Sequence, residues 1–332
     1  MGICEMSQRD PDGPVQQCIQ RMEGKLRHLL GVPDNYKVLF FQASAHAQFA
    51  AVPMNLFGRN AKADYINSGF WAHRAVTEAK KYGTVMETLD LTCSSCTSYP
   101  PVSQWNLSAD AAYVHICLNE TISGLALHED PDVGSGHVLV ADMTSSLLSR
   151  PVDVAKYGVL YASSGKNLGP AGVCVVIVRS DLLDQELSQT PTVLSWKTQA
   201  ACSNVYNTPN IFAIRVLELT LDKLLRKGGL PAAAQRSRQR AQQVYDAIDN
   251  SQGFYSNAVE PAYRSHTAIP FHIARKELEA VFLKESTEAG LYQLFGHPSV
   301  GGLRVCIYNG LPDAALEAFL QFLQDFQKRY GG

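Results

Sequence analysis

Apolar residues follow two kinds of spacing along the 332-residue chain. Over residues 14–30 they recur every three or four positions and Gly31 follows, which predicts a helix that ends at this glycine. Further on, apolar residues gather in short, nearly continuous runs, which are typical of strands in a sheet covered on both faces. These runs are "KVLFFQ", "ADYIN", "YVHICLN", "HVLVADM", "GVLYASS" and "GVCVVIV".

Helical segments alternate with the first of these strands. "AHAQFAAVPMNLF" follows the first strand, and "SGFWAHRAVTEAKKYG" follows the second, with Ser68 as its expected N-cap and Gly83 as its expected end. Alternation of strands and helices up to about residue 225 predicts an α/β fold with a mostly parallel sheet.

The pattern changes after "LLRKGG". A polar helix over residues 231–250 precedes strand-like "AIPFHI", a helix near 275–289, strand-like "GLRVCIYN" and a final helix over 313–330. We therefore predict two domains: a large α/β domain over residues 1–225 and a smaller α+β domain over residues 226–332.

Composition and charge exclude several classes of partner. A hydrophobic fraction of 46% and a charged fraction of 18% are ordinary for a globular protein. The net charge of −2 gives no sign of a surface for nucleic acid or for anionic lipid. No apolar run approaches the roughly 20 residues that a membrane-spanning helix needs, and no signal peptide is visible.

Eight cysteines are scattered along the chain, several of them inside apolar runs. Small buried side chains of this kind are typical of a reducing compartment, so we expect a cytoplasmic protein without a disulfide framework. Cys93 and Cys96 form a single C-x-x-C pair. A zinc site would need a second pair or spaced histidines, so we expect no metal.

Polar residues with chemical potential follow the predicted strands. Asp142 closes "HVLVAD", Lys166 follows "GVLYASSG", Thr121 follows "YVHICLNE", and Ala45 and His46 follow "KVLFFQAS". In an open α/β sheet, ligands bind outside the carboxyl ends of the strands. An acid and a lysine from different strand ends favour pyridoxal phosphate chemistry, in which the lysine binds the cofactor aldehyde and the acid keeps the pyridine nitrogen protonated.

Trp71, in "NSGFWAHRA", would offer a flat face to stack on the cofactor ring. Each of these residues also has an ordinary structural interpretation: a loop acid, a core tryptophan, a surface lysine. A nucleotide-binding α/β enzyme therefore stays open on the spacing alone. Neither G-x-G-x-x-G after a strand nor a P-loop is present to support it.

Longer blocks of the chain resemble a known family. The sequence is similar to the phosphoserine aminotransferases, class V enzymes of fold type I that depend on pyridoxal phosphate. The similar blocks run in order over essentially the whole chain: "GVPDNYKVLFFQ", "QFAAVPMNL", "ADYINSGFWAHRAVTEAKKYG", "YVHICLNETISG", "LVADMTSSLLSRPVDVAKYGVLYASSGKNLGPAGVCVVIVRSDLL", "VYNTP" and "SVGGLRVCIYNG".

The resemblance implies a role for each candidate cofactor residue. Lys166 would hold the cofactor as a Schiff base, Asp142 would pair with the pyridine nitrogen, Trp71 would stack on the ring, and Thr121 would bond the region of the ring hydroxyl. The remaining implied contacts, all to the cofactor phosphate, fall on Ala45, His46, Gly165, Asn207 and Thr208. Asn207 and Thr208 would reach the cofactor of a second subunit, so the resemblance implies a homodimer with shared active sites.

The resemblance also implies the substrates and the residues that hold them. Arg304 would clamp the α-carboxylate, and Arg9 and His297 would face the substrate phosphate or the side-chain carboxylate of glutamate. The implied reaction moves the amino group of glutamate to 3-phosphohydroxypyruvate, giving 2-oxoglutarate and phosphoserine in serine biosynthesis. Lys166 would shuttle the α-proton.

The chain departs from the family pattern around this implied site. Gln8 stands where a histidine is usual, Pro298 where an arginine is usual, and Gly165 where a glutamine is usual. The glycines of the phosphate turn are replaced by residues 43–45, Ala-Ser-Ala, which adopt positive φ less readily. We also expect the usual N-terminal segment, with a serine near the substrate, to be absent.

Two functions follow from different classes. The first is an active phosphoserine aminotransferase. The second is a degenerate or altered-substrate relative that keeps the fold and the dimer, because losing two or three bonds to a substrate phosphate, each contributing roughly 1.5–3 kcal/mol, would weaken recognition by orders of magnitude. Another class V enzyme, such as a cysteine desulfurase, fits less well, since no cysteine lies on an evident catalytic loop.

Overall fold

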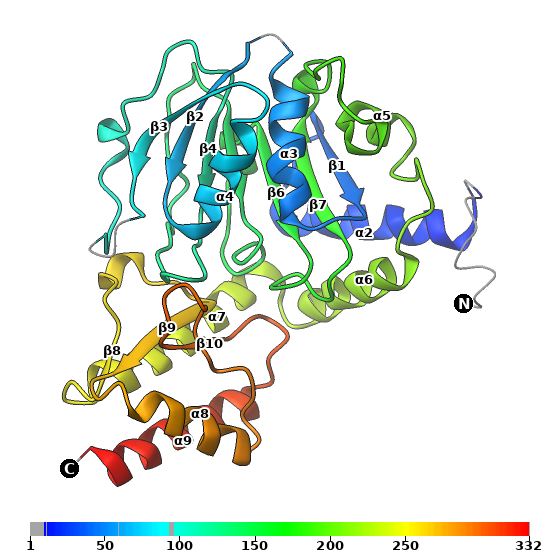
Figure 1. Cartoon of the computed structure of the whole chain (residues 1–332). Helices are drawn as coiled ribbons and strands as arrows, with labels where there is room; N and C mark the ends of the chain where they lie inside the picture. The colour runs from blue at the N-terminus through cyan, green and yellow to red at the C-terminus, as the bar shows by residue number, and fades with distance from the viewer. Residues whose placement is uncertain (1–9, 11, 59, 93–95, 332) are drawn as a thin grey trace.

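A computed structural model describes residue 10 and residues 12–58, 60–92 and 96–331. A seven-stranded sheet forms the larger part, with the strand order β1-β7-β6-β5-β4-β2-β3 (Figure 1). Its strands are β1 (Tyr36–Phe41), β2 (Lys62–Asn67), β3 (Thr84–Asp90), β4 (Val114–Cys117), β5 (Leu139–Asp142), β6 (Val159–Ser163) and β7 (Cys174–Arg179).

Six of the seven strands run in the same direction. β7 is antiparallel to both of its neighbours, β1 and β6, while β6, β5, β4, β2 and β3 pair in parallel. The carboxyl ends of β1, β4, β5 and β6 therefore lie along the same edge of the sheet.

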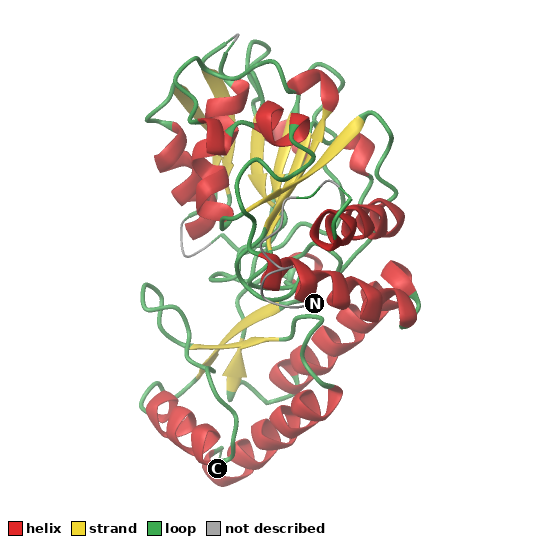
Figure 2. Ribbon diagram, turned by 90° about the vertical axis from the view of Figure 1, so that its right-hand side faces the viewer, coloured by secondary structure: helices red, strands yellow, loops and turns green. Residues whose placement is uncertain are grey.

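Helices cover both faces of this sheet, as Figure 2 shows from the side. One face packs on α2 (Pro14–Leu30) and α6 (Ile211–Arg226), and the other on α3 (Ala45–Leu56), α4 (Phe70–Ala79) and α5 (Trp196–Ala201). Successive residues of β1 alternate between the two layers: Val38 and Phe40 join the first core, and Leu39 and Phe41 join the second. Burial on both faces explains why these strands are continuously apolar.

The C-terminal part has its own sheet and core. β8 (Tyr255–Ser256), β9 (Ala268–Ile273) and β10 (Leu303–Cys306) form an antiparallel sheet in the order β10-β9-β8. A third core joins this sheet to α7 (Gly229–Asp249), α8 (Leu278–Glu288) and α9 (Asp313–Tyr330). The predicted fold class, a large α/β part with a mostly parallel sheet and a smaller α+β part, is confirmed. The boundary between residues 225 and 226 stays a prediction.

A buried acid joins α2 to α6. Glu218 on α6 accepts hydrogen bonds from Arg21 Nε at 2.7 Å, Lys25 Nζ at 3.0 Å and Cys18 Sγ at 3.0 Å, and pairs with Arg215. Its side chain is 1% exposed, and burial alone would raise its pKa. The bonds outweigh burial, so the pKa of Glu218 falls to about 2 and the carboxylate stays charged. This fixes α6, which lines a cavity described below.

Three local expectations can now be judged. The helix over 14–30 ends at Gly31 with φ of 61°, as predicted. Ser68 is not the cap of α4: Gly69 holds that position, and the Ser68 hydroxyl donates to the Cys117 carbonyl at 3.2 Å. No disulfide framework was expected; Cys96 forms a disulfide, and the cysteines at 18, 117, 174, 202 and 306 are free.

No helix in the described part of the chain is long and apolar enough to span a membrane. Within the same residues, no group of three or more histidine, cysteine, aspartate or glutamate side chains could hold a metal ion.

Candidate active site

The strand ends enclose a cavity of about 240 Å³ at the carboxyl edge of the large sheet. The ends of β4, β5 and β6 supply wall residues, the segment after β1 supplies Ser44 and the first turn of α3, and the start of α4 closes one side. The cavity brings together six of the predicted cofactor residues: Ala45, His46, Trp71, Asp142, Gly165 and Lys166.

Lys166 and Trp71 face each other across this cavity. The Nζ atom of Lys166 lies 5.0 Å from the centroid of the Trp71 ring. The indole Nε1 of Trp71 donates to Thr121 Oγ1 at 2.9 Å, which fixes the plane of the ring. His46 approaches the same indole edge-on, with ring centroids 5.7 Å apart. A flat, oriented aromatic face beside an amine suits a planar cofactor bound to that amine.

Asp142 lies at the end of β5 with 5% of its surface exposed. Its Oδ1 accepts a hydrogen bond from the Thr144 amide at 2.8 Å. Burial raises the pKa of Asp142, while the bonds from Thr144 and the positive charges of Lys166 and His46 act in the opposite direction. A protonated ring nitrogen beside this carboxylate would supply a further compensating charge, so the residues fit a pyridinium ring.

The first turn of α3 forms another wall. Ser44 is its N-cap and makes no side-chain capping bond; the Ala47 amide donates to the Ser44 carbonyl at 3.1 Å, which leaves the amides of Ala45 and His46 available to an anion. None of residues 43–45 has a positive φ, so this turn forms without the left-handed backbone for which glycine is favoured. The concern that Ala43, Ser44 and Ala45 would disfavour the turn is therefore wrong.

Gly165 leaves space in the same cavity. A Cβ atom built on Gly165 would come no closer than 3.5 Å to another described atom, the Cβ of Ala171. A Cβ atom fits here, so packing around the backbone does not require glycine.

Arg304 and His297 approach from the smaller part of the chain. Arg304, on β10, donates from Nη1 to the Thr121 carbonyl at 3.2 Å. The His297 ring lies 4.8 Å from the ring of Phe70, the residue before Trp71. Burial, followed by the positive charges of Arg304 and Arg74, lowers the pKa of His297. Thr121 is thus bonded to both Trp71 and Arg304.

Asn207 and Thr208 do not join this cavity. Both are exposed, and the Thr208 carbonyl accepts a hydrogen bond from Gln42 near the end of β1. Arg9 and Gln8 lie outside the described residues. Pro298 is exposed in the turn after His297.

Two residues that the sequence did not single out belong to this region. Glu120 is completely buried and accepts bonds from the backbone amides of Trp71 at 3.1 Å and Ala72 at 2.8 Å, so it takes the capping role expected of Ser68. Arg74 places its guanidinium carbon 5.2 Å from the Phe70 ring centroid. The sequence offered one signal for each residue. Glu120 directly precedes Thr121, and Arg74 follows Phe70 by one helical turn, so each lies next to a residue of the predicted site or its helix.

Comparison with known proteins agrees with this geometry. The family model for class V aminotransferases matches residues 6–317. Phosphoserine aminotransferases of Nitrosomonas europaea and Burkholderia ambifaria are 44% and 45% identical to the chain, covering 99% of it and 91% of each relative.

Solved structures extend the agreement to the fold. The phosphoserine aminotransferase of Bacillus circulans subsp. alkalophilus superposes with a TM-score of 0.93 at 40% identity, covering 98% of this chain and 90% of that one. A phosphoserine aminotransferase of Trichomonas vaginalis with bound pyridoxal phosphate gives 0.89 at 33% identity, covering 97% and 94%. The chain belongs to the class V aminotransferases, and within them to the phosphoserine aminotransferase family.

Proposed function

We propose that this protein is a pyridoxal-phosphate-dependent aminotransferase that moves the amino group of glutamate to 3-phosphohydroxypyruvate, forming phosphoserine and 2-oxoglutarate. The observation that carries the proposal is the convergence of Lys166, Asp142 and Trp71 in one cavity at the strand ends. Membership of the phosphoserine aminotransferase family supports the choice of substrates.

The chain's own residues suit each part of the cofactor. Lys166 would bind its aldehyde, Trp71 would cover one face of the ring, and the Asp142 carboxylate would face the ring nitrogen. The uncapped first turn of α3, with Ala45 and His46, would receive the phosphate. When bound, the cofactor supplies an electron-withdrawing ring that stabilises negative charge at the α-carbon of the amino acid.

Substrate groups would be held from both parts of the chain. The Arg304 guanidinium, next to the Thr121 carbonyl, would bind the α-carboxylate through two parallel bonds. His297 would face the substrate phosphate or the distal carboxylate, with Arg9 as its companion. The Nζ atom of Lys166, released when the substrate amine binds, would take up and return the α-proton.

A homodimer completes the proposal. Asn207 and Thr208 are exposed, and three exposed apolar side chains accompany them: Tyr206 at 38%, Phe212 at 66% and Leu219 at 45%. Exposed apolar residues gathered in one segment are typical of a subunit interface. We assign Asn207 and Thr208 to the cofactor phosphate of the partner. A cytoplasmic location is part of the proposal, supported by the free cysteines.

No observation favours the non-catalytic alternative. The departures at Gly165 and Pro298 leave Lys166, Asp142 and Trp71 around one cavity, and the turn over residues 43–45 uses no positive φ.

An absorbance titration tests this function. Purified protein mixed with pyridoxal phosphate should show the band of a lysine-bound cofactor, and both phosphoserine and glutamate should bleach it. The Lys166→Ala variant should show neither effect, whereas Lys37→Ala, an exposed change on β1, should behave as the unaltered protein. An unchanged band in Lys166→Ala would contradict the assignment of the lysine. A band that no amino acid disturbs would contradict the aminotransferase.

A further inference from the structure

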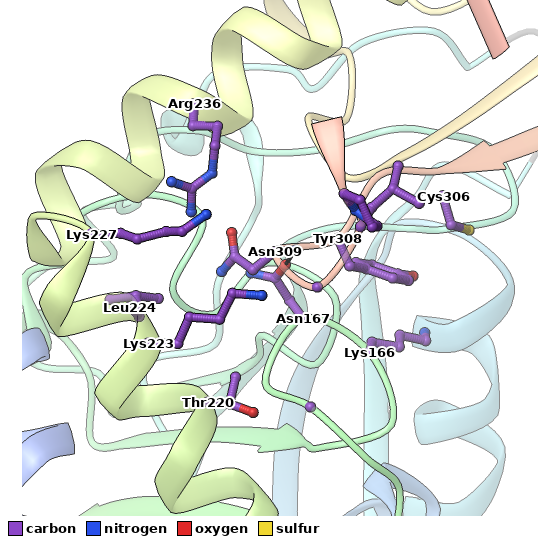
Figure 3. A pocket seen from close by; sticks show the side chains of 14 residues that line it. Lys166, Asn167, Thr220, Lys223, Leu224, Lys227, Arg236, Cys306, Tyr308 and Asn309 are labelled. Carbon is purple, nitrogen blue, oxygen red and sulfur yellow. Dashed lines mark hydrogen bonds between the residues drawn. The ribbon is translucent and has the colours of Figure 1, made fainter. Parts of the chain in front are cut away.

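A second cavity, of about 490 Å³, lies beside the candidate active site. Its walls come from α6, α7, the end of β10 and the segment between β10 and α9, and Lys166 lines both this cavity and the candidate active site. Figure 3 shows the lining side chains. We call it the α6–α7 cavity.

Three cationic side chains are directed into this cavity: Lys223 and Lys227 of α6 and its C-cap, and Arg236 of α7. No aspartate or glutamate is among the residues that line it. None of the three cations forms a salt bridge with another described residue. Because the whole chain carries a net charge of −2, this is a local concentration of positive charge.

The neighbouring acids are engaged elsewhere. Asp222 pairs with Lys25 at 2.8 Å, and Asp313 accepts a bond from Arg240 Nε at 2.9 Å. The Arg240 bond is the main reason that the pKa of Asp313 is lowered, with Lys227 and Arg236 contributing through their charges. Asp313 is also largely exposed, at 65% of its side chain, so solvent screens its effect on the cavity.

Two asparagines that line the α6–α7 cavity are held by hydrogen bonds. Asn309 donates from its backbone to Asn167 Oδ1 at 2.9 Å and from Nδ2 to the Leu148 carbonyl at 2.9 Å. Asn167 Nδ2 in turn donates to the Leu147 carbonyl at 2.7 Å. In Figure 3 the Nζ end of Lys166 points away from Lys223, Lys227 and Arg236. None of the three cations lines the candidate active-site cavity.

We propose that the α6–α7 cavity is a binding site for a small molecule that carries a phosphate group. Two ammonium groups and one guanidinium supply the point charges and the planar fork that phosphate oxygens prefer. The volume lies in the range of sites for small organic ligands, so the ligand can extend beyond the phosphate itself. The site is separate from the proposed function and does not depend on it.

Calorimetric titration with inorganic pyrophosphate tests this site. The protein is first saturated with pyridoxal phosphate, so that the cofactor phosphate position is filled, and the buffer is kept at low salt. Unaltered protein should bind pyrophosphate, with affinity that falls as salt is raised. The double variant Lys223→Ala/Lys227→Ala should bind at least about tenfold more weakly, because two charge-assisted contacts are lost.

The control removes the same charge elsewhere. Lys276→Ala/Lys284→Ala changes two exposed lysines near and within α8, and it should bind pyrophosphate as the unaltered protein does. The difference between the two double variants is also expected without added cofactor, so the test stands if the proposed function fails. Equal binding by both double variants, or no binding by unaltered protein, would overturn the proposal. Succinate binding as tightly as pyrophosphate would overturn the phosphate assignment.

Discussion

At the scale of single residues, Glu120 is a buried carboxyl group that positions the backbone of the neighbouring Trp71. Its carboxyl is enclosed behind the start of α4, where it receives the amides of Trp71 and Ala72. Burial raises its pKa from 4.5 to about 7, although the two amide bonds oppose the rise. The folded protein therefore holds a proton at Glu120 in a pH range where the unfolded chain has released it.

The raised pKa of Glu120 predicts how the stability of the protein changes with pH. Between about pH 4.5 and 7 the folded state binds the extra proton, so the contribution of Glu120 to stability falls as the pH rises and stays low above that range. In Glu120→Gln this titration is absent. Relative to the variant, unaltered protein should lose roughly 2–3 kcal/mol of unfolding free energy between pH 5 and 8. Urea unfolding at four pH values measures it.

The control for this prediction is Glu129→Gln, an exposed position near the same strand end. Its stability should follow the unaltered protein at each pH. Stability curves for Glu120→Gln and unaltered protein that run parallel would show that Glu120 does not titrate in this range.

Pro298 is the second residue whose chemistry can be tested singly. It is exposed beside His297, and Arg304 is close enough to lower the pKa of that histidine. Pro298→Arg should add one charge-assisted bond to a substrate phosphate, tightening phosphoserine binding by roughly tenfold and glutamate binding, through its distal carboxylate, by less. Bleaching of the cofactor band measures both affinities. Pro298→Gln is the uncharged control, and an equal gain in that variant would count against the pocket assignment.

At the scale of elements, the loop after β4 joins the two sheets. Gly124 donates to the Glu120 carbonyl and accepts from the Ser265 amide, each at 2.9 Å. Its φ is 79°, and a Cβ atom there would lie 2.6 Å from Cδ of Pro270 on β9. The loop that carries Glu120 and Thr121 therefore packs against the smaller sheet with no room for a side chain.

Gly124→Ala should accordingly be more harmful than the same change at Gly134. Gly134 has nearly the same φ, 80°, but no described atom lies within 4 Å of its added Cβ. Gly134→Ala should cost about 1 kcal/mol from backbone strain alone. Gly124→Ala should cost about 3 kcal/mol, because it adds a clash. Urea unfolding measures the loss of unfolding free energy in each variant. Equal losses would mean that Pro270 can move away from the added methyl group at no cost.

The elements also show what a sequence can and cannot predict. The buried strands and the helix over 14–30 could be located because their apolar runs and spacing are visible locally. β3 was missed because it is an edge strand with a mixed exposed and half-buried pattern that resembles a loop. The cap of α4 was misassigned because the acceptor, Glu120, comes from a distant part of the chain.

In the candidate site, too, some features could be predicted from the sequence and others depend on contacts between distant segments. Asp142, Lys166 and Ala45 could be grouped because parallel strands end at one edge, and that rule needs only the order of elements. The bond from Arg304 to Thr121 and the contact of Arg74 with Phe70 depend on how side chains from separate segments meet. The α6–α7 cavity likewise exists only after α6, α7 and the segment before α9 are assembled.

At the scale of the whole molecule, the exposed apolar segment predicts a dimer. Phe212 is 66% exposed at the start of α6, close to Asn207 and Thr208 in the chain. Phe212→Asp should shift the protein from dimer to monomer and weaken pyridoxal phosphate binding by about tenfold or more, because the partner's contacts to the cofactor phosphate would be lost. Sedimentation and cofactor titration measure the two effects.

Tyr292→Asp provides the comparison, since Tyr292 is 67% exposed in the smaller part of the chain. It should leave both the oligomeric state and the cofactor affinity unchanged. A Phe212→Asp protein that remains dimeric would place the interface elsewhere, and a monomer with full cofactor affinity would remove Asn207 and Thr208 from the cofactor site.

The edge position of β1 has a consequence for synthesis on the ribosome. In the described sheet β1 pairs only with β7. Phe41 pairs with Cys174, so this pair can form only after Cys174 has been translated. The strands between them in the sequence can pair earlier. At roughly 5–20 residues per second this delay lasts many seconds. The first turn of α3, which follows β1 and lines the cofactor cavity, therefore depends for its position on a strand that is made much later. A nascent chain that ends before Cys174 therefore lacks the strand pair on which the position of this wall depends.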